Sequence, residues 1–204
     1  MPGYNMRTNE GKRKAEEWRK LKAGAYQIDQ ADHNKVAMMC KSLWADPRAS
    51  LWRSMPGHAE VVIVWLDERT GLLCKMRADW LVELDDRVII LDLKSTESMD
   101  KYRKDFFKLR YDVQSAFYRS GAEAHFNKQC TFNFAAVSKS VEIGRYPTSV
   151  GAVDDADHDI AMEVMRRDMD KLKHAIESNQ WIEYDKLERT NSQREYMYEQ
   201  LNHH

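Results

Sequence analysis

Residues 72–95 read LLCKMRADWLVELDDRVIILDLKS, two apolar runs joined by a pair of aspartates. A third run, EVVIVWL at 60–66, precedes them and is separated from them by the turn-like segment DERTG. Short runs rich in β-branched residues and bounded by turn residues are typical of β-strands joined by tight connections. The sequence therefore predicts a three-stranded meander over 60–66, 72–84 and 87–95.

Helical patterns flank this meander on both sides. Before it, a charged helix is expected over 9–23, and Asp29 is expected to cap a helix whose apolar stripe faces the core. That stripe consists of Val36, Met39, Cys40 and Leu43, and Asp46-Pro47 opens a further short helix. After the meander we expect a helix over 98–120 that Gly121 ends, strands over 130–137 and 146–150, and a helix over 157–178. This order predicts an α/β fold in which helices flank a mixed central sheet.

The length and composition of the chain favour a single domain. Its 204 residues are 43% hydrophobic, which is enough for one sizeable core. We expect a helical, basic segment at 1–55, a core at about 56–184 and a C-terminal tail at 185–204. The longest apolar runs fall far short of the roughly 20 residues that span a bilayer. A soluble, cytoplasmic protein without a membrane partner is therefore expected.

Charge is distributed unevenly along the chain. The net charge is −1, yet residues 7–22 carry seven Lys or Arg against three Glu, and residues 101–119 carry six against two Asp. From residue 154 onward there are thirteen acids and seven bases. Nucleic-acid binding would thus depend on local basic segments rather than on the overall charge, although solvated helix faces that differ in sign would give the same pattern.

The three cysteines, Cys40, Cys74 and Cys130, lie far apart and form no CxxC pair. They cannot by themselves supply a four-cysteine zinc or iron–sulfur site. We expect them to be small buried apolar residues.

Two charged residues follow the apolar run Val88–Leu91. Asp92 and Lys94 are two positions apart, so their side chains should point to the same side of a strand. Asp79 lies in the preceding strand of the same meander and can supply a second carboxylate. A buried strand end accepts such charges only with partners. A structural ion pair is one explanation, and a metal site is the other.

A metal site here would favour Mg²⁺, with Mn²⁺ expected to substitute. The carboxylates of Asp79 and Asp92 and the main-chain carbonyl of Leu93 form an all-oxygen partial shell, which suits this ion. A metal would activate water and neutralise charge on a phosphodiester. Lys94 could orient the water and stabilise developing negative charge. The candidate catalytic residues are thus Asp79, Asp92 and Lys94.

The pattern of Asp79 followed thirteen positions later by Asp92-Leu93-Lys94 resembles the PD-(D/E)XK motif of restriction-endonuclease-like nucleases. Four further segments resemble the RecE-type exonuclease VIII family of phages and prophages. They are EVVIVW from Glu60, CKMRADW at 74–80, IILDLKST at 89–96 and YDVQSAFY at 111–118. The resemblance covers roughly residues 30–184, including the closing WIEY at 181–184.

This resemblance implies further site residues. Glu60 would lie near the metal and contribute to catalysis and metal binding. Gln114 and Tyr118, four positions apart on one helix face, would contact the DNA strand near the scissile phosphate. Arg110 extends that polar stripe by a turn, and Arg77 is expected to contact DNA as well.

The chain departs from the family pattern at two places. The family's catalytic-site histidine has no clear counterpart, and His33 and His58 are weak candidates for it. Ala78 stands where relatives usually have proline before the first acid. Since that proline shapes the strand and does no chemistry, alanine should be tolerated.

The resemblance implies an exodeoxyribonuclease that degrades linear double-stranded DNA from its ends. It would resect 5′ strands and leave 3′ single-stranded tails for a RecT-like annealing protein in phage-type recombination inside a bacterial host cell. Relatives are processive because they form rings, so a homo-oligomer is expected. A Cas4-like or AddB-like exonuclease would need a four-cysteine cluster. A structure-specific or restriction-type endonuclease and a catalytically silent DNA-binding module of the same fold stay open as alternatives.

Overall fold

The structure is a computed structural model that describes residues 4–21, 24 and 28–181. The chain divides into two compact units, Met1–Met165 and Arg166–His204. The sheet and the candidate site belong to the first unit. Within the second, the described residues are the C-terminal part of one helix and the few residues after it. The expected tail at 185–204 and most of the WIEY segment lie outside the described residues.

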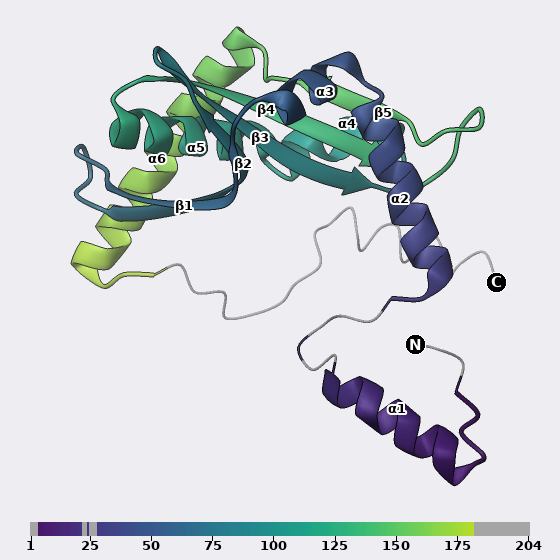
Figure 1. The fold of residues 1–204 in the computed structure, drawn as a ribbon. Coiled ribbons are helices and arrows are strands. Elements are labelled where there is room, and N and C mark those ends of the chain that lie inside the picture. The colour runs from purple at the N-terminus through teal and green to yellow at the C-terminus, as the bar shows by residue number, and fades with distance from the viewer. Residues whose placement is uncertain (1–3, 22–23, 25–27, 182–204) are drawn as a thin grey trace, which may run out of the picture. The chain divides into compact units, whose positions relative to one another are not determined.

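The described elements follow the order predicted from the sequence (Figure 1). The helices are α1 (Asn9–Leu21), α2 (Gln30–Trp44), α3 (Pro47–Ser54), α4 (Met99–Lys108), α5 (Tyr111–Phe126) and α6 (Asp155–Ser178). The strands are β1 (His58–Leu66), β2 (Leu73–Glu83), β3 (Arg87–Thr96), β4 (Gln129–Ser138) and β5 (Thr148–Gly151). The predicted meander is therefore confirmed as β1 to β3, with strand ends that shift by one or two residues.

The five strands form one sheet in the order β1-β2-β3-β4-β5. Neighbouring strands are antiparallel except for β3 and β4, which run parallel. Parallel neighbours need a crossover connection, and α4 and α5 supply it. The predicted α/β fold with a mixed central sheet is confirmed.

Helices cover both faces of the sheet (Figure 1). On one face, α2 and α3 pack against the centre of the sheet through a buried cluster of small and branched residues. This cluster comprises Leu43, Ala49, Leu91, Ala135 and Val150. On the other face lies an aromatic layer in which rings of α4 and α5 contact rings of β4. Phe106 and Tyr111 lie 5.1 and 5.8 Å from Phe134 between ring centroids. The strand β3 is thus buried between two layers, which fixes the position of its C-terminal end.

The helix predicted over 98–120 is wrong in two respects. The chain forms two helices there, separated at Leu109 and Arg110, and Arg110 takes a left-handed conformation with φ of 58°. Gly121 does not end the second helix, which continues to Phe126 and ends at the left-handed Asn127. A Cβ atom at Gly121 would lie 2.7 Å from the Trp65 ring, so this glycine allows α5 to approach β1 closely.

The apolar stripe predicted for α2 packs at one end only. Leu43 is buried, whereas Val36 and Cys40 are exposed and Met39 is only partly buried. The expectation of three buried cysteines is accordingly wrong for Cys40 and correct for Cys74 and Cys130. No helix among the described residues is long and apolar enough to cross a membrane.

Candidate functional site

Two charged side chains meet at the C-terminal end of β3. Asp92 is only 4% exposed, and its Oδ2 atom is in ion-pair contact with the Nζ atom of Lys94. The Lys94 ammonium also lies 4.7 Å from the centre of the Tyr111 ring and 5.8 Å from that of Phe134. Such positions favour a cation through the ring quadrupoles. Lys94 is therefore held between a carboxylate and two aromatic faces.

The helix α5 supplies a second partner for Asp92. Gln114 donates a hydrogen bond from Nε2 to Asp92 Oδ1 over 2.8 Å. The structure thus brings Gln114 to the predicted catalytic strand. Tyr118, one turn further along α5, packs edge-on against Phe132 with ring centroids 5.7 Å apart. The predicted pair therefore shares the sheet-facing side of α5, with the amide alone bonded to a carboxylate of the site.

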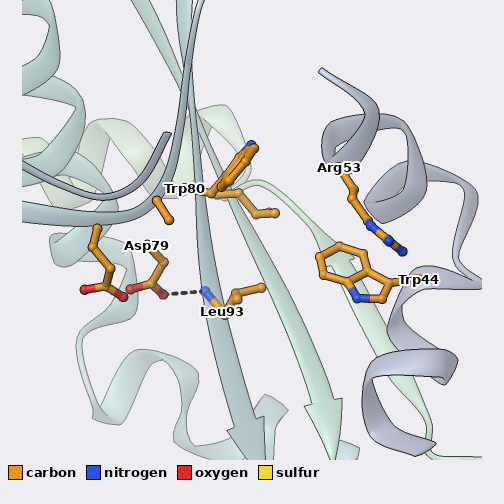
Figure 2. Close-up of a pocket in the computed structure, with 8 residues that line it drawn as sticks. Trp44, Arg53, Asp79, Trp80 and Leu93 are labelled. Atoms are coloured by element: carbon orange, nitrogen blue, oxygen red, sulfur yellow. Dashed lines mark hydrogen bonds between the residues drawn. The ribbon is translucent and has the colours of Figure 1, made fainter. Parts of the chain in front are cut away.

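Asp79 reaches the same strand end from β2. Its Oδ2 atom accepts a hydrogen bond of 2.8 Å from the main-chain N–H of Leu93, shown by the dashed line in Figure 2. The main-chain ladder between β2 and β3 ends at the pair Trp80 and Leu91. Beyond it, the Asp79 side chain accepts the hydrogen bond from the Leu93 N–H. Asp79 is therefore tied directly to the residue between Asp92 and Lys94.

The electrostatics of the site favour a cation. Burial raises the pKa of Asp92 above its ordinary value, the contacts with Lys94 and Gln114 lower it, and the nearby charge of Asp79 raises it further. The overall direction is upward, so one protein cation does not compensate for the burial of this carboxylate beside a second acid. An additional positive charge would stabilise the ionised form.

Glu60 lies at an irregular point in β1. Its φ is 56°, which for a residue other than glycine is strained and rare within a strand. Residues on either side of it pair with β2, but Glu60 itself does not. Its carboxylate forms an ion pair of 2.9 Å with Arg77, and both side chains are largely exposed, at 59% and 66%. The predicted metal ligand Glu60 and the predicted DNA contact Arg77 are therefore bonded to each other.

The donor set fits a hard, oxygen-preferring cation with few protein ligands. Among the described residues, no three His, Cys, Asp or Glu side chains lie close enough to hold an ion by themselves. Mg²⁺ needs no such cluster, because it retains several waters and commonly binds one or two carboxylates together with substrate phosphates. Asp79 and Asp92 supply two carboxylates, and the charge of Asp79 lies near enough to raise the pKa of Asp92, in addition to the larger effect of burial.

Arg110, His33, His58 and Ala78 are the remaining residues named from the sequence. Arg110 occupies the left-handed position that precedes α5, and His33 and His58 are exposed on α2 and at the start of β1. Ala78 is fully buried in β2, directly before Asp79. No described contact joins either histidine to Asp79 or Asp92.

A cavity beside Asp79 was not foreseen from the sequence. It has a volume of about 700 Å³, and Figure 2 shows part of its walls. It is lined by Trp44, Arg53, Ala59, Glu60, Asp79, Trp80, Leu91 and Leu93. Asp79 and Trp80 both line it although they are adjacent in β2, and the ladder between β2 and β3 ends beside it, at Trp80 and Leu91. The only signal in the sequence was a tryptophan next to the first acid.

One solved structure shares this architecture. A crystal structure of a protein from Eubacterium rectale named "Putative exonuclease" superposes with a TM-score of 0.56 at 14% identity, over 91% of this chain and 68% of that one. The structure of SSO0001 matches with a TM-score of only 0.37 at 15% identity, over 80% and 68% of the two chains. No curated protein matches the sequence.

Family membership rests on the sequence. Residues 8–194 match the model of the PDDEXK-like domain of unknown function (DUF3799), which covers most of the chain. The predicted resemblance to the PD-(D/E)XK superfamily is confirmed by this match. The chain therefore belongs to this family of PDDEXK-like domains.

Proposed function

We propose that this protein is a Mg²⁺-dependent deoxyribonuclease that degrades linear double-stranded DNA from its ends. One observation carries the proposal: a buried Asp92, bonded to Lys94 and Gln114, lies beside Asp79 at the end of β3. PDDEXK nucleases generally use divalent metal ions, which agrees with the two-carboxylate donor set.

Each residue has a definite task in this chemistry. Asp79 and Asp92 would hold the metal, which when bound supplies a water of lowered pKa and neutralises charge on the phosphate. Gln114 fixes the orientation of Asp92 through its hydrogen bond. Lys94, confined by Asp92 and two rings, would orient the attacking water and stabilise the charge that develops on the phosphate.

The basic side chains of α4 provide a path for the DNA backbone. Lys101, Arg103, Lys104 and Lys108 are all exposed on this helix, which follows β3 directly. Lysine and arginine contacts to phosphate supply affinity that does not depend on base sequence. Gln114, Tyr118, Arg110 and Arg77 would complete the contacts near the cleaved bond.

Action on ends is the finer part of the proposal. It is supported by the segments that resemble RecE-type exonucleases and by the name of the structural neighbour from Eubacterium rectale. Such an enzyme would resect the 5′ strand and leave a 3′ tail for a RecT-like annealing protein. A ring of several copies around the duplex would explain how a chain of net charge −1 stays on DNA. The ring would hold the duplex without a strongly basic surface.

The experiment compares an end-labelled linear duplex with a covalently closed circle, in Mg²⁺, Mn²⁺ and EDTA. We expect the metal-dependent loss of linear DNA only, and a fall of at least about 10²-fold in Asp92→Asn, as for loss of one transition-state contact. Asp86→Asn is the matched control, because Asp86 is an exposed acid paired with Arg87 at a turn.

Each other outcome has a definite meaning. Cleavage of the circle would favour an endonuclease. Equal rates for Asp92→Asn and wild type would refute the catalytic assignment. If no DNA is cleaved in either metal, the chain is a DNA-binding module or serves another function.

A further inference from the structure

The cavity beside Asp79 is lined by aromatic, apolar and charged residues. Two indole side chains, of Trp44 and Trp80, line it together with the apolar Leu91 and Leu93. One basic residue, Arg53, and two acidic residues, Glu60 and Asp79, also line it. Its volume of about 700 Å³ lies within the range of small-molecule sites, roughly 300–1,000 Å³. We call it the aromatic cavity.

The walls of this cavity are held by packing on the sheet. Trp44 and Trp80 pack against the buried cluster that joins α2 and α3 to β3. The Arg53 guanidinium lies 5.5 Å from the centre of the Trp44 ring. Gly57 lies so close to Trp80 that a Cβ atom there would be 2.6 Å from its Nε1 atom. The indoles are thus positioned before any ligand arrives, which lowers the entropic cost of binding.

The elements around the cavity and the chemistry of its lining residues indicate which kind of ligand fits it. Figure 2 shows Trp44 and Arg53 on helices and Asp79, Trp80 and Leu93 on neighbouring strands. A ligand in this space would therefore have an aromatic surface beside it and Asp79, one of the two proposed metal ligands, at one boundary. Asp92 and Lys94 alternate with Leu91 and Leu93 along β3 and face the α5 side of the sheet. An unpaired nucleotide has the matching chemistry: a flat base that stacks on indole, and an attached phosphate that a guanidinium and the metal site attract.

We propose that the aromatic cavity binds the base of a nucleotide splayed out of a DNA end, next to the phosphodiester that is cleaved. This inference rests on the proposed nuclease function and specifies its substrate. A base inside an intact duplex cannot present its face to protein rings, because neighbouring bases cover it. The enzyme accordingly requires a single-stranded or frayed terminus, and blunt duplex ends must open before they can be cut.

Binding measurements test the base separately from catalysis. The chain carrying Asp92→Asn is titrated, in Mg²⁺, with fluorescent single-stranded oligonucleotides that either have a terminal base or carry an abasic residue there. Anisotropy gives the ratio of the two dissociation constants. Since base–aromatic stacking is worth about 1–3 kcal/mol, we expect the intact end to bind at least about 5-fold more tightly.

The same ratio is then measured with Trp44→Ala and with Trp52→Ala. Both tryptophans pack against the same buried cluster, but only Trp44 lines the cavity. The base-dependent ratio should fall to about one in Trp44→Ala, recover in Trp44→Phe, and persist in Trp52→Ala. Circular dichroism verifies that each variant is folded.

The outcomes separate this inference from the proposed function. If the wild type cleaves linear DNA while the ratio is unaffected by Trp44→Ala, the nuclease stands and the base-binding role is wrong. If nothing is cleaved but the base dependence follows Trp44, the cavity binds nucleotides and the catalytic proposal fails. An Asp92→Asn chain that binds neither oligonucleotide overturns the inference, as does a wild type that cuts blunt ends as fast as ends with unpaired nucleotides.

Discussion

Glycine at position 60 should stabilise this protein more than alanine does, in contrast to its effect in an ordinary strand. Glu60 has a φ of 56°, and a left-handed conformation costs an L-residue about 1–2 kcal/mol. Glycine avoids this cost but loses about 0.5–1 kcal/mol through backbone entropy. Both replacements remove the exposed Glu60–Arg77 ion pair equally. The difference between Glu60→Gly and Glu60→Ala should therefore be about 1 kcal/mol in favour of glycine.

Urea and thermal unfolding measure this difference. For a chain of this size, 1 kcal/mol corresponds to roughly 2–4 °C in Tm. Val62, two residues along the same strand, provides the matched control, because it is exposed and has no positive φ. At position 62 the alanine variant should be the more stable by about 0.5–1 kcal/mol. If the alanine variant is more stable than the glycine variant at position 60 as well as at position 62, the backbone of Glu60 is not strained.

The DNA cleavage rates of Glu60→Gly and Glu60→Ala distinguish a role of the Glu60 carboxylate from a role of its backbone conformation. If Glu60 binds metal, as predicted from the resemblance, both replacements lower the rate equally. If the strained backbone instead positions Asp79, only the glycine variant loses activity.

Three further predictions concern the interior of the site and the sheet. In EDTA, Asp92→Asn should gain stability relative to wild type as the pH rises. The pKa of Asp92 is higher in the folded chain than in the unfolded chain, so the wild type loses stability as the pH rises above the ordinary pKa of an aspartate. Urea unfolding between pH 4 and 8 measures the gain, and a difference independent of pH would contradict it. Gln114→Ala should lower the initial cleavage rate by about 10–100-fold by freeing Asp92, and an unchanged rate would leave Gln114 without a positioning role. Gly121→Ala should destabilise the fold by about 1–3 kcal/mol in a thermal melt, because its Cβ atom would lie 2.7 Å from the Trp65 ring; a melt like that of wild type would show that α5 shifts freely.

The sequence predicted the sheet well where local signals agree. The runs at 60–66, 72–84 and 87–95 combine β-branched residues with turn segments, and all three are strands. The period of two also placed Asp92 and Lys94 together, and they are in contact. These features depend on short stretches of chain, which is why a single sequence reveals them.

Features that depend on tertiary contact were missed. The segment 98–120 has a continuous apolar stripe and contains no proline. No local sequence signal therefore predicts the break between the two helices at Leu109 and Arg110. Gly121 looked like a helix terminator, but its role is to allow contact with Trp65, more than fifty residues away. The walls of the aromatic cavity likewise come from α2, α3 and the three strands β1, β2 and β3. No periodicity in the sequence connects Trp44 with Asp79.

The single parallel pair in the sheet has a consequence for the order in which the site is completed during folding. The hydrogen bond from Leu93 to Asp79 closes a loop of only fourteen residues inside the meander. The bond from Gln114 to Asp92 spans twenty-two residues and depends on α5, within the long crossover that must close before β4 can pair with β3. Longer closures are entropically slower, so we expect the meander to acquire its native contacts first. On this view Asp92 stays exposed to water until the crossover docks, and the chain becomes competent to bind metal only in the last stage of folding.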